Sequence, residues 1–215
     1  MPPPVKSRSY RSPLRERRAQ ETRAAILDAA DRLFGANGYL ATRLADVAAE
    51  ANVSLATVKL VFRTKTELLL TLWHRTLAGG VDDQVPVADR PWERAIYEAS
   101  DPAVKLRQAA RNATMVRQRI AKLYAVIETA AAVDPSIAEL QSRMAGEFYA
   151  NQRAIIEDLH KGGHLRPGLT VAAATDIMYT LNNGRGYLLL VHDRGWSPQR
   201  YESWLAELLQ RELLR

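Results

Sequence analysis

The sequence has no cysteine, and this absence excludes disulfide frameworks, zinc ribbons, Cys-bound clusters and thiol nucleophiles. It also has no apolar run of the ~18 residues that a membrane-spanning helix needs, and its longest apolar cluster is Tyr187 to Val191. The first ten residues are rich in proline and basic residues but have no apolar core of a secretory signal. We therefore expect a cytoplasmic protein that does not interact with membranes.

Charge is abundant, and its distribution along the chain is uneven. The 215 residues are 47% hydrophobic and 25% charged, as in soluble globular proteins. The net charge of +6 lies entirely in residues 1–78, which have 13 Lys and Arg against 7 Asp and Glu, whereas residues 79–215 have 17 of each. A basic region followed by a neutral one indicates an anionic polymer such as nucleic acid as partner. The alternative is a solubilising tail, since six of the cations precede residue 19.

The spacing of apolar residues predicts an all-α protein of about nine helices. Residues 1–18 contain four prolines, several serines and six cations without an apolar period, which predicts a flexible basic arm. Apolar residues then recur every three or four positions in two regions, 19–78 and 79–215, and Gly79 to Pro91 is predicted to be a linker. Helix starts are predicted at Asp101-Pro102, Asp134-Pro135, Thr170 and Ser197-Pro198.

The segment from Leu44 to Arg63 has the pattern of a helix-turn-helix, in which the second short helix enters the major groove of DNA. Ala48 supplies the small residue that the helix crossing requires, and Ser54 is predicted to cap the second helix. Asn52 occupies the turn position that usually holds glycine, and asparagine is the other residue that best tolerates the left-handed conformation. The apolar positions that would lock the two helices together are Val47, Ala51, Val53, Val58 and Val61. The alternative is an ordinary helical hairpin within a bundle.

A series of short motifs surrounds this segment: Arg23-Ala24-Ala25-Ile26-Leu27-Asp28-Ala29-Ala30, Leu33-Phe34, Gly38-Tyr39, Ala41-Thr42, Asp46-Val47-Ala48, Ala51-Asn52-Val53-Ser54, Thr57, Phe62, Lys65 and Glu67-Leu68-Leu69. In order and spacing, these motifs resemble the N-terminal domain of the tetracycline-repressor (TetR) family of transcriptional regulators. The remainder of the chain resembles the family only as a helical domain that binds a ligand and dimerises. The resemblance therefore implies a helix-turn-helix domain followed by a ligand-binding and dimerisation domain.

The resemblance also implies which residues contact DNA. The family uses the recognition helix, the N-terminus of the preceding helix and a lysine at the start of the fourth helix, where backbone N–H groups already favour a phosphate. The recognition helix departs from the family because Leu55, Ala56 and Lys59 replace what are commonly lysine, glycine and tyrosine, so the operator sequence cannot be transferred. Lys59 is suited to guanine or to a phosphate, and Leu55 and Ala56 are suited to thymine methyl groups. The predicted DNA-binding set is Thr42, Arg43, Ser54, Leu55, Ala56, Thr57, Lys59, Leu60 and Lys65. The arm either enters a minor groove or adds nonspecific affinity.

The neutral region contains a candidate ligand pocket near the middle of its long helices. A pocket between helices needs mostly apolar walls with a few polar anchors. The residues predicted to line it are Met115, Arg119, Tyr124, Glu128, Phe148, Tyr149, Gln152, Asn182 and Asn183. The stretch 182–186 places two glycines within a helical period, which indicates a kink, a pocket wall or a close helix contact. The alternative is that these side chains form core or ordinary surface.

The last two helices are expected to form a dimer, because the family pairs its last two helices into a four-helix bundle. The predicted interface is Tyr201, Trp204, Leu205, Leu208 and Leu209, although an intrachain core would have the same pattern. His160 and His164 have the spacing of a metal-binding helix face, but Gly162-Gly163 separates them and no third ligand is evident. We therefore predict no metal and no cofactor.

Together these features predict a homodimeric transcriptional regulator that a small-molecule effector releases from a near-palindromic operator in double-stranded DNA. Repression is the expected sign of regulation. Two alternatives come from other functional classes: an architectural DNA-binding protein without an effector, and a helical enzyme or adaptor on a DNA-binding fold that no longer binds DNA. No arrangement of catalytic side chains stands out, so we do not expect an enzyme.

Overall fold

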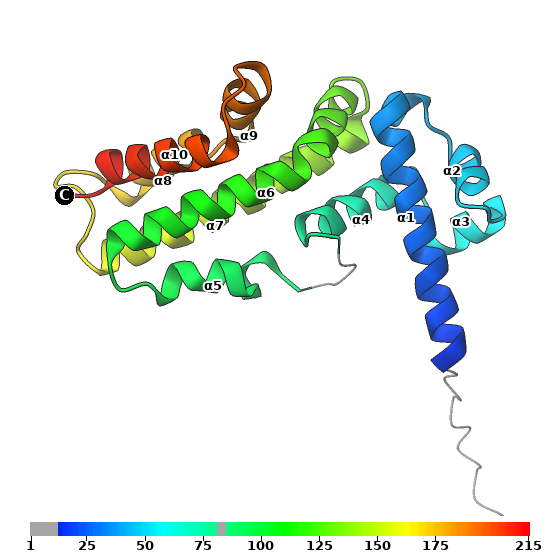
Figure 1. Ribbon diagram of the computed structural model, residues 1–215, viewed down its shortest axis with the longest axis horizontal. Helices are drawn as coiled ribbons and strands as arrows, with labels where there is room; N and C mark the ends of the chain where they lie inside the picture. The colour runs from blue at the N-terminus through cyan, green and yellow to red at the C-terminus, as the bar shows by residue number, and fades with distance from the viewer. Residues whose placement is uncertain (1–12, 81–84) are drawn as a thin grey trace, which may run out of the picture. The chain divides into compact units, whose positions relative to one another are not determined.

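The computed structural model of the protein describes residues 13–80 and 85–215 (Figure 1). Within these ranges the secondary structure is helical apart from one isolated bridge between Leu165 and Leu214. Nine helices have seven or more residues, and α9 adds a single turn, so the predicted all-α fold is confirmed. The chain forms two compact units, one ending at Leu72 and the other beginning at Trp73.

The N-terminal unit contains α1 (Pro13–Ala41), α2 (Leu44–Glu50), α3 (Leu55–Val61) and the start of α4 (Lys65–Leu77). The prediction of a flexible arm as far as Arg18 is wrong for its last six residues, because α1 already begins at Pro13. Proline suits the first helical position, where its missing N–H is not needed, and Glu16 in the first turn complements the helix dipole. The rest of the predicted arm, residues 1–12, lies outside the described residues.

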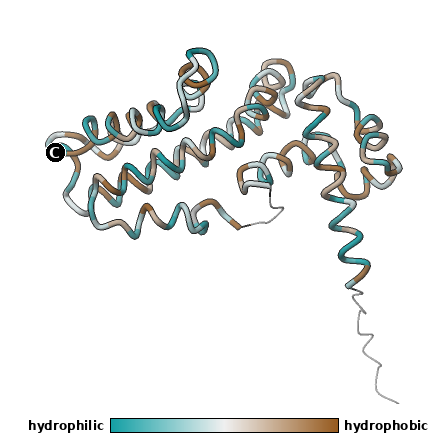
Figure 2. Tube along the Cα trace, in the orientation of Figure 1, coloured by the Kyte–Doolittle hydropathy of each residue, from teal (hydrophilic) through white to brown (hydrophobic). Residues whose placement is uncertain are grey.

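Apolar side chains from all four helices form the core of this unit. They recur along each helix at helical spacing, without long continuous runs (Figure 2). Helix α1 is kinked at Gly38, which has a φ of 77° that L side chains rarely adopt. The fully buried residues of the core include Ile26, Leu27, Phe34, Val47, Val58, Phe62, Leu68 and Leu69.

The C-terminal unit is built around the antiparallel pair of long helices α6 (Pro102–Ala131) and α7 (Pro135–Lys161) (Figure 1). Helix α5 (Pro91–Glu98) and helix α10 (Pro198–Leu213) pack on α6, and α8 (Val171–Leu181) packs on α7 and α10. The predicted starts of the four longer helices are confirmed. Their N-cap residues, each of which accepts a backbone N–H, are Asp101, Asp134, Thr170 and Ser197.

Two features of this unit differ from the sequence prediction. The 3-10 turn Val87–Asp89 lies in the predicted linker, and the eight-residue α5 was not predicted; neither has the length that a helical period needs to be recognised. The helical period that was expected to continue through residues 182–186 instead breaks after Leu181. Asn183 then caps α9 (Gly184–Tyr187), which continues into a π-helix, Leu188–Asp193.

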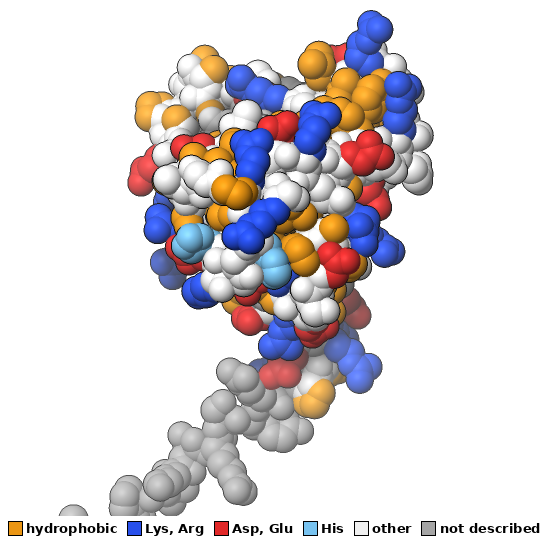
Figure 3. Space-filling view, turned by 90° about the vertical axis from the view of Figure 1, so that its left-hand side faces the viewer, with side chains coloured by type: hydrophobic (Ala, Val, Ile, Leu, Met, Phe, Trp, Pro, Cys, Tyr) orange, Lys and Arg blue, Asp and Glu red, His pale blue; other side chains and the backbone are white. Residues whose placement is uncertain are grey.

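No helix of the described ranges is long and apolar enough to cross a membrane. At the end of the C-terminal unit that carries the chain terminus, Lys and Arg side chains alternate with Asp and Glu (Figure 3). This mixed surface agrees with the balanced charge of residues 79–215 and contrasts with the excess positive charge of residues 1–78.

Candidate nucleic-acid interface and interior cavity

The turn between α2 and α3 has the geometry of a helix-turn-helix. Asn52 has a φ of 54° and is the one non-glycine residue with a positive φ in the described ranges, which confirms its predicted left-handed conformation. The backbone N–H groups of Asn52 and Val53 donate to the carbonyls of Ala49 and Ala48, at 3.1 and 3.0 Å. These bonds close the turn tightly and fix the direction in which α3 leaves it.

Helix α3 presents an exposed face that the sequence predicted. Val58 is fully buried beneath it, and the Ser54 hydroxyl accepts the backbone N–H of Thr57 at 3.0 Å, so the predicted N-cap is confirmed. Leu60 is 84% exposed and Leu55 37%, which are high values for leucine. The other predicted contact residues on α3 are Ala56 and Lys59, which are exposed, and Thr57, which is half-buried.

Thr42, which was predicted to contact DNA, is 1% exposed, so its side chain faces the interior of the unit. Its hydroxyl donates to the carbonyls of Gly38, at 2.8 Å, and Leu33, at 3.2 Å. These are carbonyls near the end of α1, where the kink leaves acceptors without helical partners. Thr42 therefore stabilises the end of α1.

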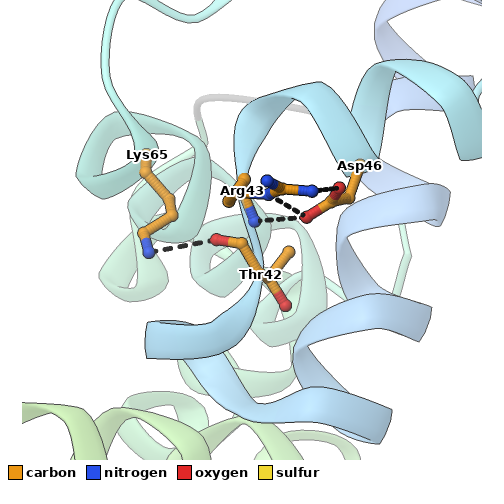
Figure 4. Close-up of polar contacts among 4 residues, drawn as sticks. All are labelled: Thr42, Arg43, Asp46 and Lys65. Atoms are coloured by element: carbon orange, nitrogen blue, oxygen red, sulfur yellow. Dashed lines mark hydrogen bonds and ion pairs between the residues drawn. The ribbon is translucent and has the colours of Figure 1, made fainter.

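Arg43 lies at the N-cap of α2 with its side chain directed into solvent (Figure 4). Its Nε and Nη2 atoms donate to the Asp46 carboxylate at 3.1 and 2.9 Å, and its backbone N–H donates to the same carboxylate at 3.0 Å. The side-chain hydrogen bond to Asp46 raises the pKa of Arg43, and the same bond lowers the pKa of Asp46. Asp46 therefore holds a permanent cation at the start of α2.

Lys65, predicted to bind a phosphate, makes a different set of contacts. Its ammonium donates to the carbonyl of Thr42 at 3.1 Å (Figure 4). It also donates to the carbonyl of Tyr39 at 2.9 Å and lies 4.1 Å from the centre of the Tyr39 ring. At the start of α4 the Thr64 hydroxyl accepts the backbone N–H of Glu67 at 3.0 Å, and the Glu67 carboxylate accepts the backbone N–H of Arg63 at 3.0 Å. Lys65 thus ties the first turn of α4 to the chain between α1 and α2.

The C-terminal unit contains a cavity of about 180 Å³ between α4, α5, α6, α7 and α8. Five of the nine predicted ligand residues line it: Tyr124, Phe148, Gln152, Asn182 and Asn183. The break after α8 forms part of the wall through Asn182, Asn183 and Gly184, as one interpretation of that stretch predicted.

The other four predicted ligand residues do not line this cavity. Arg119 is exposed and donates to the carbonyl of Leu77 near the end of α4, at 3.3 Å. Glu128 forms an ion pair with Arg185 at 2.6 Å, and the Tyr149 hydroxyl donates to Asp176 at 2.9 Å. Met115 is half-buried on another side of α6. They lie outside the cavity because even residues near the middle of a long helix point in different directions around it.

Several lining residues were missed, and three of them are charged: Glu93, Arg117 and the exposed Glu147. Glu93 of α5 is buried, and Asn112 of α6 donates to its carboxylate at 3.5 Å. Burial raises the pKa of Glu93. Arg117 of α6 donates to the carbonyl of Asn182 at 2.9 Å, and burial lowers its pKa. Trp73 and Trp92 also line the cavity; the unpredicted α5 region supplies Trp92 and Glu93, so no sequence pattern connected them to α6.

Three of the five residues predicted to form the dimer seam belong instead to the core of the same chain. Tyr201 is 1% exposed, and Leu205 and Leu209 are completely buried where α10 packs on α6 and α8. Trp204 and Leu208 are half-buried, and the Trp204 ring packs on Trp196 and Tyr201. An amphipathic helix has one main apolar face, and in α10 that face is used within the chain.

Comparison with protein families gives two matches. The family of bacterial regulatory proteins named tetR matches residues 26–72, which include the helix-turn-helix. The C-terminal family of BetI-type transcriptional repressors matches residues 102–214, more than half of the chain. No curated protein matches the sequence.

Solved structures of several bacterial regulators have the same fold. A putative transcriptional regulator from Saccharomonospora viridis in complex with choline is 21% identical, with a TM-score of 0.69 over 91% of this chain and 99% of that one. NalD, the secondary repressor of the MexAB-OprM multidrug efflux pump in Pseudomonas aeruginosa, is 23% identical, with a TM-score of 0.66 over 92% and 98%. SmeT, the repressor of the Stenotrophomonas maltophilia efflux pump SmeDEF, is 17% identical, with a TM-score of 0.67 over 92% of each chain.

The family matches agree with the geometry of both units: a helix-turn-helix with an exposed second helix, followed by a helical domain with an internal cavity. They favour the predicted regulator over the alternative of an enzyme. The chain belongs to the TetR family of bacterial regulatory proteins, with a BetI-type C-terminal domain, and is a DNA-binding transcriptional repressor.

Proposed function

We propose that the repressor binds a near-palindromic operator as a homodimer and leaves it when a small molecule occupies the cavity of the C-terminal unit. The observation that carries this proposal is the continuity of α4. This helix lines the cavity through Trp73 and Leu77, and its first residue, Lys65, holds the end of α1 and the start of α2. A ligand that displaces Trp73 therefore acts on the same helix that anchors the DNA-binding elements.

The proposed DNA contacts come from α3 and the start of α2. Lys59 and Arg43 are exposed cations that reach guanine edges or phosphates, and the apolar side chains Leu55, Ala56 and Leu60 contact thymine methyl groups. Ser54 and Thr57 share a hydrogen bond of 2.8 Å at the N-terminus of α3, so they orient the helix as well as face the duplex. Two such helices in a dimer enter successive major grooves ~34 Å apart or a multiple of that distance.

The proposed dimer interface uses the outward faces of α8 and α10. Ala173, Asp176 and Thr180 are exposed on α8 and lie on one side of the helix, since they are three, four and seven positions apart. The core-facing side of α10, which contains Leu205 and Leu209, is excluded from the interface because it is already buried within the chain.

The proposed location of the protein is the cytoplasm, because its proposed partner is the operator DNA of a bacterium.

The effector is proposed to bind where the walls are apolar and a few polar groups converge. The S. viridis protein has been solved with choline, and SmeT with triclosan. A coupling free energy of about 1 to 3 kcal/mol between this site and the operator would weaken DNA binding by about 5- to 150-fold.

Selection of bound genomic fragments tests the proposal directly. The full chain is mixed with fragmented genomic DNA, and the recovered fragments should share a near-palindromic site whose affinity falls steeply with salt, since several phosphates are neutralised. Small molecules that the products of the neighbouring genes are expected to make, degrade or transport are then tested for their ability to release the protein from that site. Recovery of no preferred fragment, or binding that is independent of salt, would contradict the proposal. Specific binding that no molecule in the cavity weakens would instead support an architectural protein without an effector.

A further inference from the structure

Arg117 stands out among the cavity residues because it is a cation without a counter-charge. Its Nη2 atom donates to the carbonyl of Asn182, and its guanidinium lies 4.9 Å from the centre of the Phe148 ring. Its Nε atom is buried and has no hydrogen-bond partner among the described residues. Within residues 13–80 and 85–215, no carboxylate forms an ion pair with it.

Two other cations of this unit are buried, and both have partners. Lys105 is 6% exposed and forms an ion pair with Asp158, and Arg90 is 9% exposed and donates to the carbonyl of Val85 at 2.9 Å. On the surface, Arg185 is paired with Glu128, and Arg153 with Glu157. Arg117 differs from Lys105 in having no carboxylate partner among the described residues. Its position in the wall of a cavity suggests that the missing partner comes from outside the chain.

Burial of a cation without a counter-charge destabilises the folded protein, and an arginine does not lose its proton to avoid that effect. The carbonyl of Asn182 follows α8, so the negative end of that helix dipole compensates part of the charge. That contact uses one of the five guanidinium N–H groups. A carboxylate provides the full opposite charge and accepts two parallel hydrogen bonds, which is the arrangement that arginine favours.

A second unsatisfied atom lies next to Arg117. The Oδ1 atom of Asn182 is buried and has no hydrogen-bond partner in the described ranges, while its amide nitrogen donates to Gln152 at 2.8 Å. Because Arg117 contacts the backbone of the same residue, the unused donor and the unused acceptor belong to neighbouring groups. A ligand with a carboxylate and a nearby hydroxyl or N–H group satisfies both.

The rest of the cavity wall is suited to a ligand with one aromatic ring. Five aromatic side chains line the cavity, and its volume of about 180 Å³ exceeds the roughly 150 Å³ that holds benzene in a protein interior. The aromatic lining residues are Trp73, Trp92, Tyr124, Phe148 and Tyr179. Of the two glutamates in the lining, Glu147 is exposed to water, and Glu93 is buried with its pKa raised. Arg117 therefore determines the charge that the interior favours.

We propose that the effector is an aromatic carboxylate of about one ring and that its carboxylate binds Arg117. This inference rests on the proposed function of the cavity as the effector site. It sets this chain apart from the choline-bound S. viridis regulator, since choline is a cation.

Calorimetric titration of the full chain with four probes tests the charge preference. Phenylacetate, phenylacetamide and phenethylamine share one ring and differ in charge, and choline represents a cation without a ring. We expect phenylacetate to bind at least tenfold more tightly than each of the other three. Equal or tighter binding of the amide, the amine or choline would overturn the proposal, as would failure of phenylacetate to bind.

Two variants locate the carboxylate. Arg117→Gln should remove the preference for phenylacetate over phenylacetamide. Arg117→Lys keeps a positive charge, so it should retain part of that preference. Arg119→Gln is the matched control, because Arg119 lies on the same helix, is exposed and does not line the cavity; its preference should equal that of the natural protein. Melting curves identify any variant that does not fold, and the comparison is then made with Arg117→Lys alone. An unchanged preference in both Arg117 variants would overturn the proposal.

Different results would contradict the role of the cavity as effector site and its preference for a carboxylate. If choline or phenethylamine binds the cavity and releases the protein from its operator, the cavity is the effector site but the inference about charge is wrong. If phenylacetate binds through Arg117 and leaves the operator complex unchanged, the anion site exists but the proposed coupling to DNA is wrong.

Discussion

Glu93 is a buried carboxyl group whose pKa is raised, chiefly by loss of solvation. The protonated form therefore stabilises the folded state. That contribution is complete below the ordinary pKa of glutamate and is lost as the pH rises through the raised pKa of the folded protein. Glutamine cannot ionise. We therefore expect the melting temperature of Glu93→Gln to fall less than that of the natural protein as the pH is raised from 4 to 7. Glu147→Gln, at an exposed position of the same cavity, should follow the natural protein. Parallel melting profiles for Glu93→Gln and the natural protein would contradict this expectation.

Arg117 and Arg119 show at the residue scale what the sequence could not predict. They are two positions apart on α6, so their side chains point about 200° apart around the helix. Arg119, which was predicted to line the pocket, contacts the end of α4 from outside, whereas Arg117, which was not predicted, lines the cavity. Helical period alone gives relative directions. Which direction is interior depends on where α7 and α8 pack, and that information lies far away in the chain.

At the scale of elements, Lys65 joins α4 to the end of α1, and its replacement separates two possible roles. Lys65→Met removes the bonds to the carbonyls of Tyr39 and Thr42, and we expect a loss of about 1 to 3 kcal/mol in unfolding free energy. If Lys65 positions the DNA-binding elements, operator affinity falls while its salt dependence keeps the same slope. If it instead contacts a phosphate, as the family resemblance implied, the slope falls by about one. Lys59→Met is the control for a directly exposed lysine.

The elements that the sequence predicted well are those with local signals. Asp101, Asp134, Thr170 and Ser197 cap their helices as expected, and Asn52 adopts the left-handed turn, because these features depend on a few adjacent residues. The apolar face of α10 was assigned to a dimer interface because packing within one chain and packing between two chains require the same pattern of apolar residues. The fold class was therefore predictable, whereas the partners of each helix face needed the tertiary structure.

At the scale of the whole molecule, dimerisation determines how many phosphates each binding event neutralises. An arginine at the exposed position Ala173 of α8 would place a charge in the proposed interface, so we expect Ala173→Arg to sediment as a monomer. A monomer presents one α3 instead of two, so its operator affinity should fall and the slope of log affinity against log salt should decrease to about half. Ala138→Arg, at an exposed position on α7, adds the same charge elsewhere and should leave the mass and the slope unchanged. If both variants sediment as dimers with the full slope, α8 does not form the interface. A natural protein that is monomeric at operator-saturating concentration would remove the homodimer from the proposal altogether.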